Sequence, residues 1–376
     1  MNRNLNRTGE VSAGLVQAGA VLTADLGAIR ANYRTLKTRL GGKSCAAVVK
    51  ADGYGLGTGE VARALLAEGC DTFFVAHVNE GFALRDALGQ QPVIYILNGV
   101  SPGAEAACVD ANLRAVLNSR AQLDAWRTEA QRRGASLAAA IQVDSGMSRL
   151  GMSPDEVEAI ALDPSLLQGI DVSLVMSHLA CADEPDHPAN EAQRTAFELL
   201  RKLLPNAPAS LANSSGIFLG PDFHFDLARP GAALYGINPT PGKPNPMRAV
   251  VKLEAKVIQT RVVEADIGVG YGHTFRSRAP LRLATISLGY ADGWRRNAVM
   301  SAWFNDIELP FAGRVSMDSI ILDISGLPEN ALKPGDLVEL IGPHQSVDDV
   351  AAAAGTIGYE ILTSLAHRFH RIYAGS

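Results

Sequence analysis

The feature that most constrains the fold is an alternation of short apolar runs with amphipathic stretches from residue 20 to about 236. Stretches such as 119–133 and 190–204 have the apolar spacing of surface helices, whereas the runs between them have the length of strands. Strands separated by helices predict βαβ units and a parallel sheet. Eight runs favour an α/β fold of the TIM (β/α)8 barrel type over a six-stranded doubly wound sheet. The runs are 45–49, 72–76, 92–97, 113–117, 137–143, 170–176, 209–212 and 223–228.

The sequence changes character near a proline-rich segment, 238–246, which is a natural domain boundary. Strand-like segments follow, with little helix until the end of the chain: 250–263, 281–287 and 319–324. We therefore predict a barrel domain at residues 21–244 and a second, mostly β C-terminal domain at 245–376. Residues 10–20 are a candidate addition to the second domain.

The composition is that of an ordinary soluble globular protein, with 47% hydrophobic residues, 19% charged residues and a net charge of −5. The acidic balance and the lack of a Lys/Arg run argue against a nucleic-acid partner. No apolar run approaches the roughly 18–20 residues of a membrane helix, so we expect no membrane partner. The four cysteines form no CxxC pair, which argues against a disulfide framework or a metal site and fits a cytoplasmic location.

The N-terminal segment is a weak candidate for an export signal. Arg3 and Arg7 precede a Gly/Ala-rich stretch, 11–22, that faintly resembles a signal peptide. Glu10 precedes this stretch and Gln17 interrupts it, and its apolar character is low. We therefore expect a loose N-terminal extension.

A lysine closes the first apolar run. Run 45–49 leads directly into Lys50, and a glycine-rich segment, 51–57, follows. In a (β/α)8 barrel the catalytic groups lie at the C-terminal ends of the strands, so this amine is expected at the barrel mouth. Desolvation there favours the neutral amine that a Schiff base requires. A lysine at a strand end is more often simply solvated, but the glycines let the backbone approach a ligand closely.

The seventh and eighth runs end in segments suited to binding a phosphate, 213–216 and 229–232. Both are expected to run into helix N-termini, where free N–H groups and hydroxyls can hold an anion. Arg229 could reach a ring nitrogen or could instead pair with Asp226. Together with Lys50, the two segments indicate the cofactor pyridoxal 5'-phosphate (PLP).

Segment 47–57, AVVKADGYGLG, resembles the highly specific cofactor-lysine signature of the alanine racemases. The resemblance covers nearly the whole chain, since further family-like segments follow in the family's order: 23–33, 144–151, 177–178, 212–214, 229–236, 269–272, 289–293, 313–318 and 358–360. It implies a PLP-dependent racemase that interconverts L- and D-alanine. It also implies a homodimer with shared active sites.

The resemblance gives the two catalytic roles to Lys50 and Tyr271. Lys50 would hold PLP as a Schiff base and then act as acid or base on one face, and Tyr271 of the second subunit would act on the other face. Racemisation needs two such groups, because one removes the α-proton and the other returns a proton to the opposite face. A tyrosine with a reference pKa of about 10 needs help to act as a base. The resemblance places His178 beside Tyr271, with Arg229 beyond.

The remaining family positions bind cofactor or substrate. Arg229 would donate to the pyridine nitrogen, and because an arginine does not give up its proton, the ring would be a weaker electron sink. Arg149 and the backbone of Met317 would contact the ring oxygen of PLP and the substrate carboxylate. The other cofactor positions are Tyr54, Asn213, Ser214, Gly231, Ala232 and Tyr359, and the narrow mouth of the site is formed by Tyr290, Tyr359, Asp183, Arg296 and Arg314.

Gln142 is the main departure from the family pattern. A lysine, carbamylated in some members, usually stands there, and its carbamate can orient Arg149 through charge-assisted hydrogen bonds. Gln142 is neutral, so we expect the charge of Arg149 to be compensated by a bound anion such as chloride or, alternatively, by Asp144. Ser316 and Ala232 also differ from the common residues, with no expected effect on function.

Three other functions share part of this pattern. A racemase of wider range, acting on lysine or serine, would share the catalytic residues. A barrel PLP decarboxylase would share Lys50, but Arg229 and the motif around Tyr271 argue against it. A non-catalytic PLP carrier would not need the β domain with Tyr290 and Met317. The sequence leaves open whether the role is D-alanine biosynthesis for peptidoglycan precursors or alanine catabolism.

Overall fold

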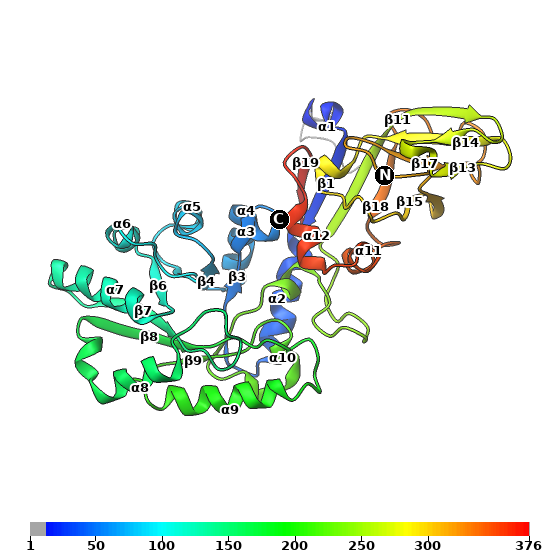
Figure 1. The fold of residues 1–376 in the computed structure, drawn as a ribbon. Coiled ribbons are helices and arrows are strands. Elements are labelled where there is room, and N and C mark those ends of the chain that lie inside the picture. Colours follow the sequence, from blue (N-terminus) through cyan, green and yellow to red (C-terminus); the bar gives the residue numbers. More distant parts are fainter. Residues whose placement is uncertain (1–12, 376) are drawn as a thin grey trace. The chain divides into compact units, whose positions relative to one another are not determined.

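The structure, a computed structural model, describes residues 13–375. The chain divides into two compact units (Figure 1). The barrel unit covers Ala28–Arg248, and the β unit consists of the chain up to Gly27 together with the chain from Ala249. No helix within residues 13–375 is long and apolar enough to span a membrane. Residues 1–12, which hold much of the candidate export signal and the start of segment 10–20, lie outside the described residues.

The barrel unit is built on a curled sheet of seven parallel strands in sequence order. The strands of this unit are β2 (Ser44–Cys45), β3 (Ala47–Val48), β4 (Thr72–Val75), β5 (Val93–Ile96), β6 (Arg114–Leu117), β7 (Leu137–Gln142), β8 (Ile170–Met176), β9 (Ala209–Ser210) and β10 (Leu227–Ala228). β10 pairs with β2, which continues into β3 after one residue. The N–H of Arg229 donates to the carbonyl of Ala212 (2.9 Å), which links the segments of β10 and β9. All eight predicted runs therefore contribute strands, and the predicted TIM-like fold is confirmed.

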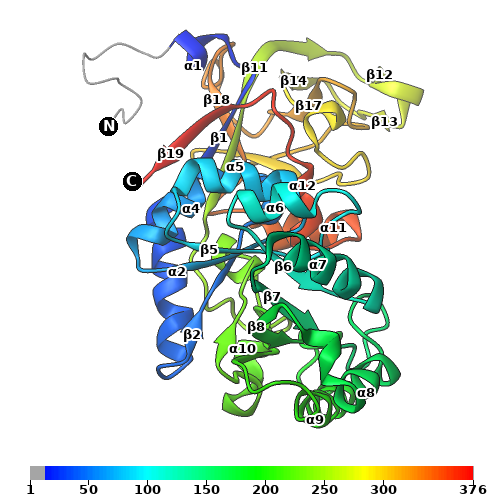
Figure 2. The same ribbon diagram turned by 90° about the vertical axis from the view of Figure 1, so that its left-hand side faces the viewer.

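The helices of this unit are α2 (Leu26–Arg39), α3 (Lys50–Tyr54), α4 (Thr58–Ala67), α5 (Val78–Leu88), α6 (Glu105–Asp110), α7 (Arg120–Arg133), α8 (Pro154–Leu162), α9 (Ala189–Arg201), α10 (Gly216–Leu219), and the 3-10 helices η1 (Pro164–Leu167), η2 (Pro221–Phe223) and η3 (Ala232–Tyr235). Longer helices such as α4, α5, α7 and α9 lie around the outside of the curled strands (Figure 2). The helices predicted at 119–133 and 190–204 are present as α7 and α9. The hydroxyl of Ser119 caps the first turn of α7, and Gly134 ends it in a left-handed conformation. These caps satisfy backbone groups that a helix end leaves unpaired.

The eighth strand is shorter than predicted. The prediction of a strand over 223–228 is wrong for residues 223–226, because only β10 (Leu227–Ala228) forms a strand there. Pro221 begins η2, and Phe225 has a left-handed φ of 50°. The ring of Phe225 packs edge-on against Phe197 of α9, with the ring centroids 5.0 Å apart. The apolar character of this ring therefore serves packing against a helix.

The β unit is organised around the long strand β11, which pairs antiparallel with β1, β14 and β18. Its strands are β1 (Ala20–Asp25), β11 (Val251–Val263), β12 (Gly268–Val269), β13 (Phe275–Arg276), β14 (Leu281–Ile286), β15 (Ser301–Phe304), β16 (Ile307–Pro310), β17 (Ile320–Asp323), β18 (Leu337–Ile341) and β19 (His370–Ala374). Its helices are α1 (Ala13–Gln17), α11 (Val347–Ala354), α12 (Gly358–Ser364), and the 3-10 helices η4 (Tyr271–His273) and η5 (Tyr290–Asp292). The three predicted strands correspond to β11, β14 and β17.

Strand β1 lies in the β unit, whereas the sequence assigned its residues from 21 onward to the barrel domain. The barrel domain was expected to begin at residue 21, but β1 lies between β11 and β19. Leu22 is fully buried, so the sheet formed by the end of the chain also requires a strand from its beginning. Residues 13–20 belong to the same unit, where the ammonium of Lys256 donates to the carbonyl of Val16 (2.7 Å).

Candidate active site

Lys50 lies at the start of a left-handed turn. It comes two residues after β3 and opens α3, in which φ is 54° at Ala51 and Asp52, 59° at Gly53 and 55° at Tyr54. For residues other than glycine, this geometry costs roughly 1–2 kcal/mol each. Such conformations persist only where the surroundings fix them, and they cluster at functional sites. The turn therefore singles out Lys50 on structural grounds, independently of its sequence motif.

Three hydrogen bonds hold this turn from its two ends. The backbone carbonyl of Asp52 accepts from the N–H of Gly57 (2.8 Å), and its carboxylate accepts from the N–H of Thr58 (3.0 Å). The carboxylate of Glu80 accepts from the N–H of Ala51 (2.7 Å). Glu80 was not predicted from the sequence as a site residue. The available signal was a glutamate in the first turn of a helix that follows the second apolar run.

The environment of Lys50 favours a neutral amine. The side chain is half-buried, and its desolvation, followed by the positive charge of Arg149, lowers the pKa of Lys50, while Glu80 opposes this effect. A neutral amine is the nucleophilic form of lysine that reacts with a carbonyl group.

Arg229 is a buried guanidinium that follows β10. It donates to the carbonyl of Ser177 (2.6 Å) and to the hydroxyl of Ser210. The pairing with Asp226 that the sequence allowed is wrong, because Asp226 pairs with Lys43 (3.6 Å). Burial lowers the pKa of Arg229 to about 9. No carboxylate pairs with Arg229 in residues 13–375, so the guanidinium is suited to a ligand that offers an acceptor.

His178 lies beside Arg229, with its Nδ1 3.5 Å from Nη2 of the guanidinium. Burial, followed by the charges of Arg229, Arg149 and Lys50, lowers the pKa of His178 to about 3. The imidazole is therefore neutral at physiological pH. Because a guanidinium can only donate, Nδ1 is the acceptor and Nε2 carries the proton. His178 thus offers its Nε2–H as a hydrogen-bond donor on the side of the ring away from Arg229.

A cluster of polar groups next to the left-handed turn contains Tyr54, Ser214 and Gly231. The Ser214 hydroxyl accepts from the N–H of Gly231 (3.0 Å) and of Ala233 (3.1 Å). The ring of Tyr54 stacks on Tyr235, with centroids 4.4 Å apart. A Cβ at position 231 would lie 2.2 Å from the Tyr54 hydroxyl, so the approach requires glycine. These groups form one cluster of hydroxyl and backbone N–H groups.

The two segments expected to bind phosphate run into helices. The side-chain oxygen of Asn213 accepts from the N–H of Gly216 (2.8 Å) at the start of α10. Ala232 begins η3. Both helices are single turns, so their contribution to anion binding comes from local N–H groups and much less from a macrodipole.

Arg149 lies in the loop after β7 and is exposed. Asp144 does not pair with Arg149 within residues 13–375, and its carboxylate accepts instead from the N–H groups of Gly146 and Met147 (both 2.9 Å) in the same loop. Compensation by a bound anion stays a prediction. Gln142 is buried and donates to the carbonyl of Leu150 (3.2 Å). Gln142 therefore contacts the backbone next to Arg149 and leaves the guanidinium unpaired by any carboxylate of residues 13–375.

The other predicted site residues are exposed. Asp183 lies in the barrel unit, whereas Arg296, Arg314 and the residues below lie in the β unit. Tyr271, in η4 between β12 and β13, has an exposed fraction of 66%. The segments of Tyr290 and Met317 are brought together, because the N–H of Tyr290 donates to the carbonyl of Ser316 and the N–H of Ala291 to that of Met317 (both 3.0 Å). Tyr359 lies in the first turn of α12. Each of these side chains is exposed by more than a third.

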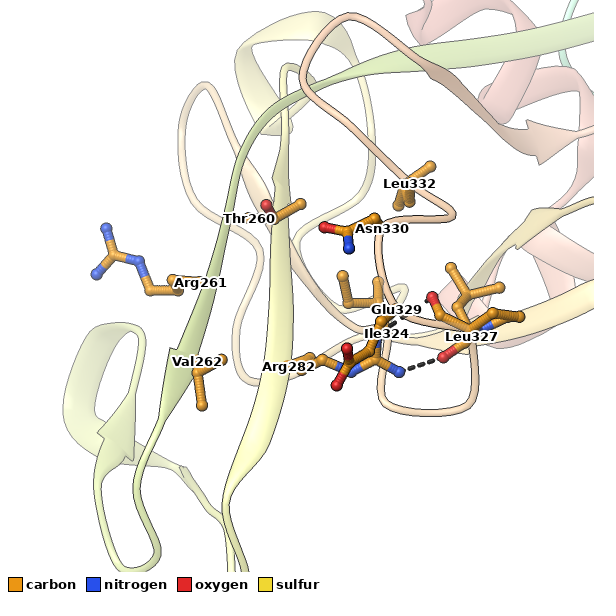
Figure 3. A pocket seen from close by; sticks show the side chains of 10 residues that line it. Thr260, Arg261, Val262, Arg282, Ile324, Leu327, Glu329, Asn330 and Leu332 are labelled. Carbon is orange, nitrogen blue, oxygen red and sulfur yellow. Dashed lines mark hydrogen bonds between the residues drawn. The ribbon is translucent and has the colours of Figure 1, made fainter.

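A hollow of about 330 Å³ lies elsewhere in the β unit, between β11, β14 and the loop after β17 (Figure 3). One of its charged side chains, Arg282, already donates to the carbonyls of Ser325 (2.9 Å) and Leu327. The hollow contains none of the predicted site residues. Its lining is Thr260, Arg261, Val262, Arg282, Ile324, Leu327, Pro328, Glu329, Asn330 and Leu332.

Comparison with known families covers both units. Residues 24–239 match the alanine racemase N-terminal domain, and residues 250–373 match the alanine racemase C-terminal domain. The chain belongs to the alanine racemase family. Alanine racemases thus share both units of this structure, in the same order along the chain.

Close relatives cover almost the full length of the chain. It is 68% identical over 358 residues to "Alanine racemase, catabolic" of Mesorhizobium japonicum, covering 95% of this chain and 94% of the relative. It is 51% identical to the protein of the same name from Agrobacterium fabrum, covering 95% and 92%. The solved alanine racemase of Bartonella henselae "with covalently bound pyridoxal phosphate" superposes with a TM-score of 0.91 at 44% identity, covering 95% and 99%.

Proposed function

We propose that this chain is a PLP-dependent alanine racemase in which Lys50 and Tyr271 are the two acid–base groups. The observation that carries the proposal is the left-handed turn that presents the half-buried amine of Lys50. The names of the relatives and the covalently bound PLP of the Bartonella henselae enzyme support the activity and the cofactor.

The residues of the barrel unit fit PLP by their chemistry. Lys50 offers an amine of lowered pKa for the covalent link. Arg229, buried and unpaired by a carboxylate among residues 13–375, would donate to the ring nitrogen. Tyr54, Ser214 and the N–H groups near Gly231 would hold the phosphate. When bound, PLP supplies the electron sink that makes the α-proton of alanine acidic.

The chain's own residues then move the proton. Lys50 would take or return it at Nζ on one face of the substrate, and Tyr271 at its hydroxyl oxygen on the other. His178 would donate its Nε2 proton toward the Tyr271 oxygen and so favour the phenolate, and Arg229 fixes that tautomer. Arg149, Tyr290 and the backbone of Met317 would orient the substrate carboxylate.

The test of the proposal is chemical and enzymatic. Purified protein is incubated with borohydride and digested, and the cofactor is expected on the peptide that contains Lys50. Lys50→Ala and Tyr271→Phe are expected to lose about 10²–10⁴-fold of the racemisation rate in a chiral chromatographic assay. Lys202→Ala, at an exposed helix end, is the matched control. A cofactor label on another lysine would refute the proposal.

The substrate range is tested with the same assay. We propose alanine as the preferred substrate because the relatives carry that name. Lysine and serine are the discriminating additions to the panel. Turnover of either at a rate close to that of alanine would favour a racemase of wider range.

We propose further that Tyr271 acts in the active site of a partner subunit. Its exposed ring and its location in the β unit support this arrangement. Lys50→Ala and Tyr271→Phe subunits are mixed under conditions of subunit exchange. Half of the dimers would be mixed, each with one intact site of two, so about one quarter of wild-type activity should return. Exchange without recovered activity would exclude shared sites.

We propose a catabolic role in the cytoplasm. The two relatives named above are called catabolic, which supports the role. Cys70 and Cys108 are buried free thiols, which suits a reducing compartment. A deletion strain should lose growth on alanine as carbon source without requiring D-alanine. A strict requirement for D-alanine would instead indicate a role in peptidoglycan synthesis.

A further inference from the structure

Glu80 connects two neighbouring βα units of the barrel through backbone N–H groups. One of its carboxylate oxygens accepts from the N–H groups of Ala76 (2.7 Å) and His77 (3.0 Å) at the start of α5. The other oxygen accepts from the N–H of Ala51 (2.7 Å), which belongs to the preceding unit. All three partners are donors. An ionised carboxylate, which only accepts, is the side-chain group that satisfies all of them.

The bond to Ala51 falls at the start of the left-handed turn. Ala51 is the first of the left-handed residues and follows Lys50 directly. A fixed N–H at this position determines the direction in which the chain leaves Lys50, and therefore the direction of its side chain. Asp52 holds the other end of the turn through Gly57 and Thr58. Glu80 thus fixes the turn at the end nearest the reactive amine.

The charge of Glu80 acts on the same amine. Desolvation and Arg149 disfavour the ammonium form of Lys50, and Glu80 is the group that favours it. Removing the negative charge while retaining the shape of the side chain should therefore leave a larger fraction of Lys50 neutral.

We propose that Glu80 is a positioning residue for Lys50, which orients the left-handed turn through Ala51 and balances the charge of the lysine. This inference rests on the proposed role of Lys50 as the cofactor lysine. It adds a residue from the second βα unit that does not itself touch cofactor or substrate.

The barrel contains a matched control at Glu156. This glutamate occupies the same position in α8, accepts from the N–H of Ser153 (2.8 Å) and reaches the N–H of Arg120 (2.8 Å) in the preceding unit. The hydrogen-bonded bridge of Glu156 ends at Arg120, the first residue of the right-handed helix α7, and no lysine of the site follows Arg120. Glu156→Gln therefore removes the same kind of bridge without touching the turn of Lys50.

The experiment compares Glu80→Gln, Glu80→Asp and Glu156→Gln in the full-length enzyme. PLP is removed with hydroxylamine, and reloading of each protein shows that it stays folded. Acylation of Lys50 by a limiting reagent is then measured across pH by peptide mass spectrometry, with the exposed Lys37 and Lys202 as internal references. At about pH 8, Glu80→Gln should acylate about three- to tenfold faster than wild type. Glu80→Asp keeps the charge and should stay close to wild type.

The outcomes separate the proposal from a purely structural role. Glu156→Gln should lower the melting temperature as Glu80→Gln does and leave the Lys50 profile unchanged. If the two glutamine variants give the same Lys50 profile, the proposal is wrong, whatever the activity. If Glu80→Gln does not fold, the comparison is repeated in an Ala51→Gly background, because glycine adopts the left-handed φ without strain. Borohydride labelling of wild type tests the role of Lys50 separately.

Discussion

Gly231 shows how a single missing side chain shapes the proposed cofactor site. Its φ lies in the ordinary range, so the need for glycine comes from the Tyr54 hydroxyl, which would lie 2.2 Å from a Cβ. Tyr54 cannot easily move, because its ring is stacked on Tyr235 and its backbone belongs to the left-handed turn. An added methyl group would therefore displace the phosphate end of the site.

Gly231→Ala should weaken PLP binding by more than about tenfold, which corresponds to about 1.4 kcal/mol. Absorbance titration of the cofactor-free protein with PLP measures this change. Gly326→Ala is the control, because a Cβ there meets open space. Unchanged PLP affinity in Gly231→Ala would show that the Tyr54 side chain moves aside without a measurable free-energy cost.

His178 should make the folded protein sensitive to acid. Its pKa in the folded state, about 3, lies below the unfolded value near 6.5. Between these two values the unfolded chain binds more protons, so the free energy of unfolding falls as the pH is lowered from about 6.5 toward 3. His178→Gln should reduce the change in the free energy of unfolding with pH, which urea unfolding at several pH values measures. The exposed His367→Gln is the control, and equal slopes in wild type and His178→Gln would contradict the burial argument.

At the scale of elements, a buried arginine joins the end of α5 to the next strands. Arg85 donates to the carbonyls of Gly89 (2.7 Å), Pro92 (2.9 Å), Ala111 (3.1 Å) and Asn112 (2.6 Å). These carbonyls belong to the loops that precede β5 and β6. One guanidinium thus satisfies four backbone acceptors that would otherwise be short of donors.

Arg85→Met should destabilise the fold by about 2–4 kcal/mol, because several partly buried carbonyls lose their donor at once. Urea unfolding followed by circular dichroism measures the loss. Arg63→Met, which removes an exposed ion pair with Glu60, should cost less than about 1 kcal/mol. A loss for Arg85→Met as small as that of Arg63→Met would show that water replaces the guanidinium.

The sequence predicted elements better than it predicted conformations. The apolar runs and Lys50 could be predicted because periodicity and a local motif encode them. The left-handed turn at Ala51 could not be predicted, because the N–H of Ala51 is held by Glu80, which lies in the next βα unit. The absence of a carboxylate partner for Arg229 in residues 13–375 also depends on distant residues, since Asp226 pairs with Lys43. Long-range partners decide such cases, and a single sequence does not reveal them.

At the scale of the whole molecule, the β unit depends on its first strand. β1 pairs with β11 on one side and with β19 on the other, and Leu22 is fully buried. A charge at position 22 would be buried without a partner, whereas Thr23 is only partly buried.

Leu22→Asp should destabilise the β unit by more than about 4 kcal/mol, and Thr23→Asp much less. Tryptophan fluorescence separates the units, since Trp126 lies in the barrel unit and Trp294 in the β unit. Limited proteolysis of Leu22→Asp should cut first within residues 249–375. First cuts within the barrel unit would contradict the assignment of β1.

The position of β1 also sets an order of events during synthesis. This strand is synthesised before both of its neighbours, β11 and β19, which are made after the whole barrel unit. The barrel unit can therefore fold while β1 still has two unpaired edges, and β19 closes the sheet that β1 begins. Completion of the sheet is thus delayed until β19 has been made, and a chain that stops short of β19 carries an open, apolar strand edge. Such incomplete chains are the species most exposed to aggregation and to capture by chaperones.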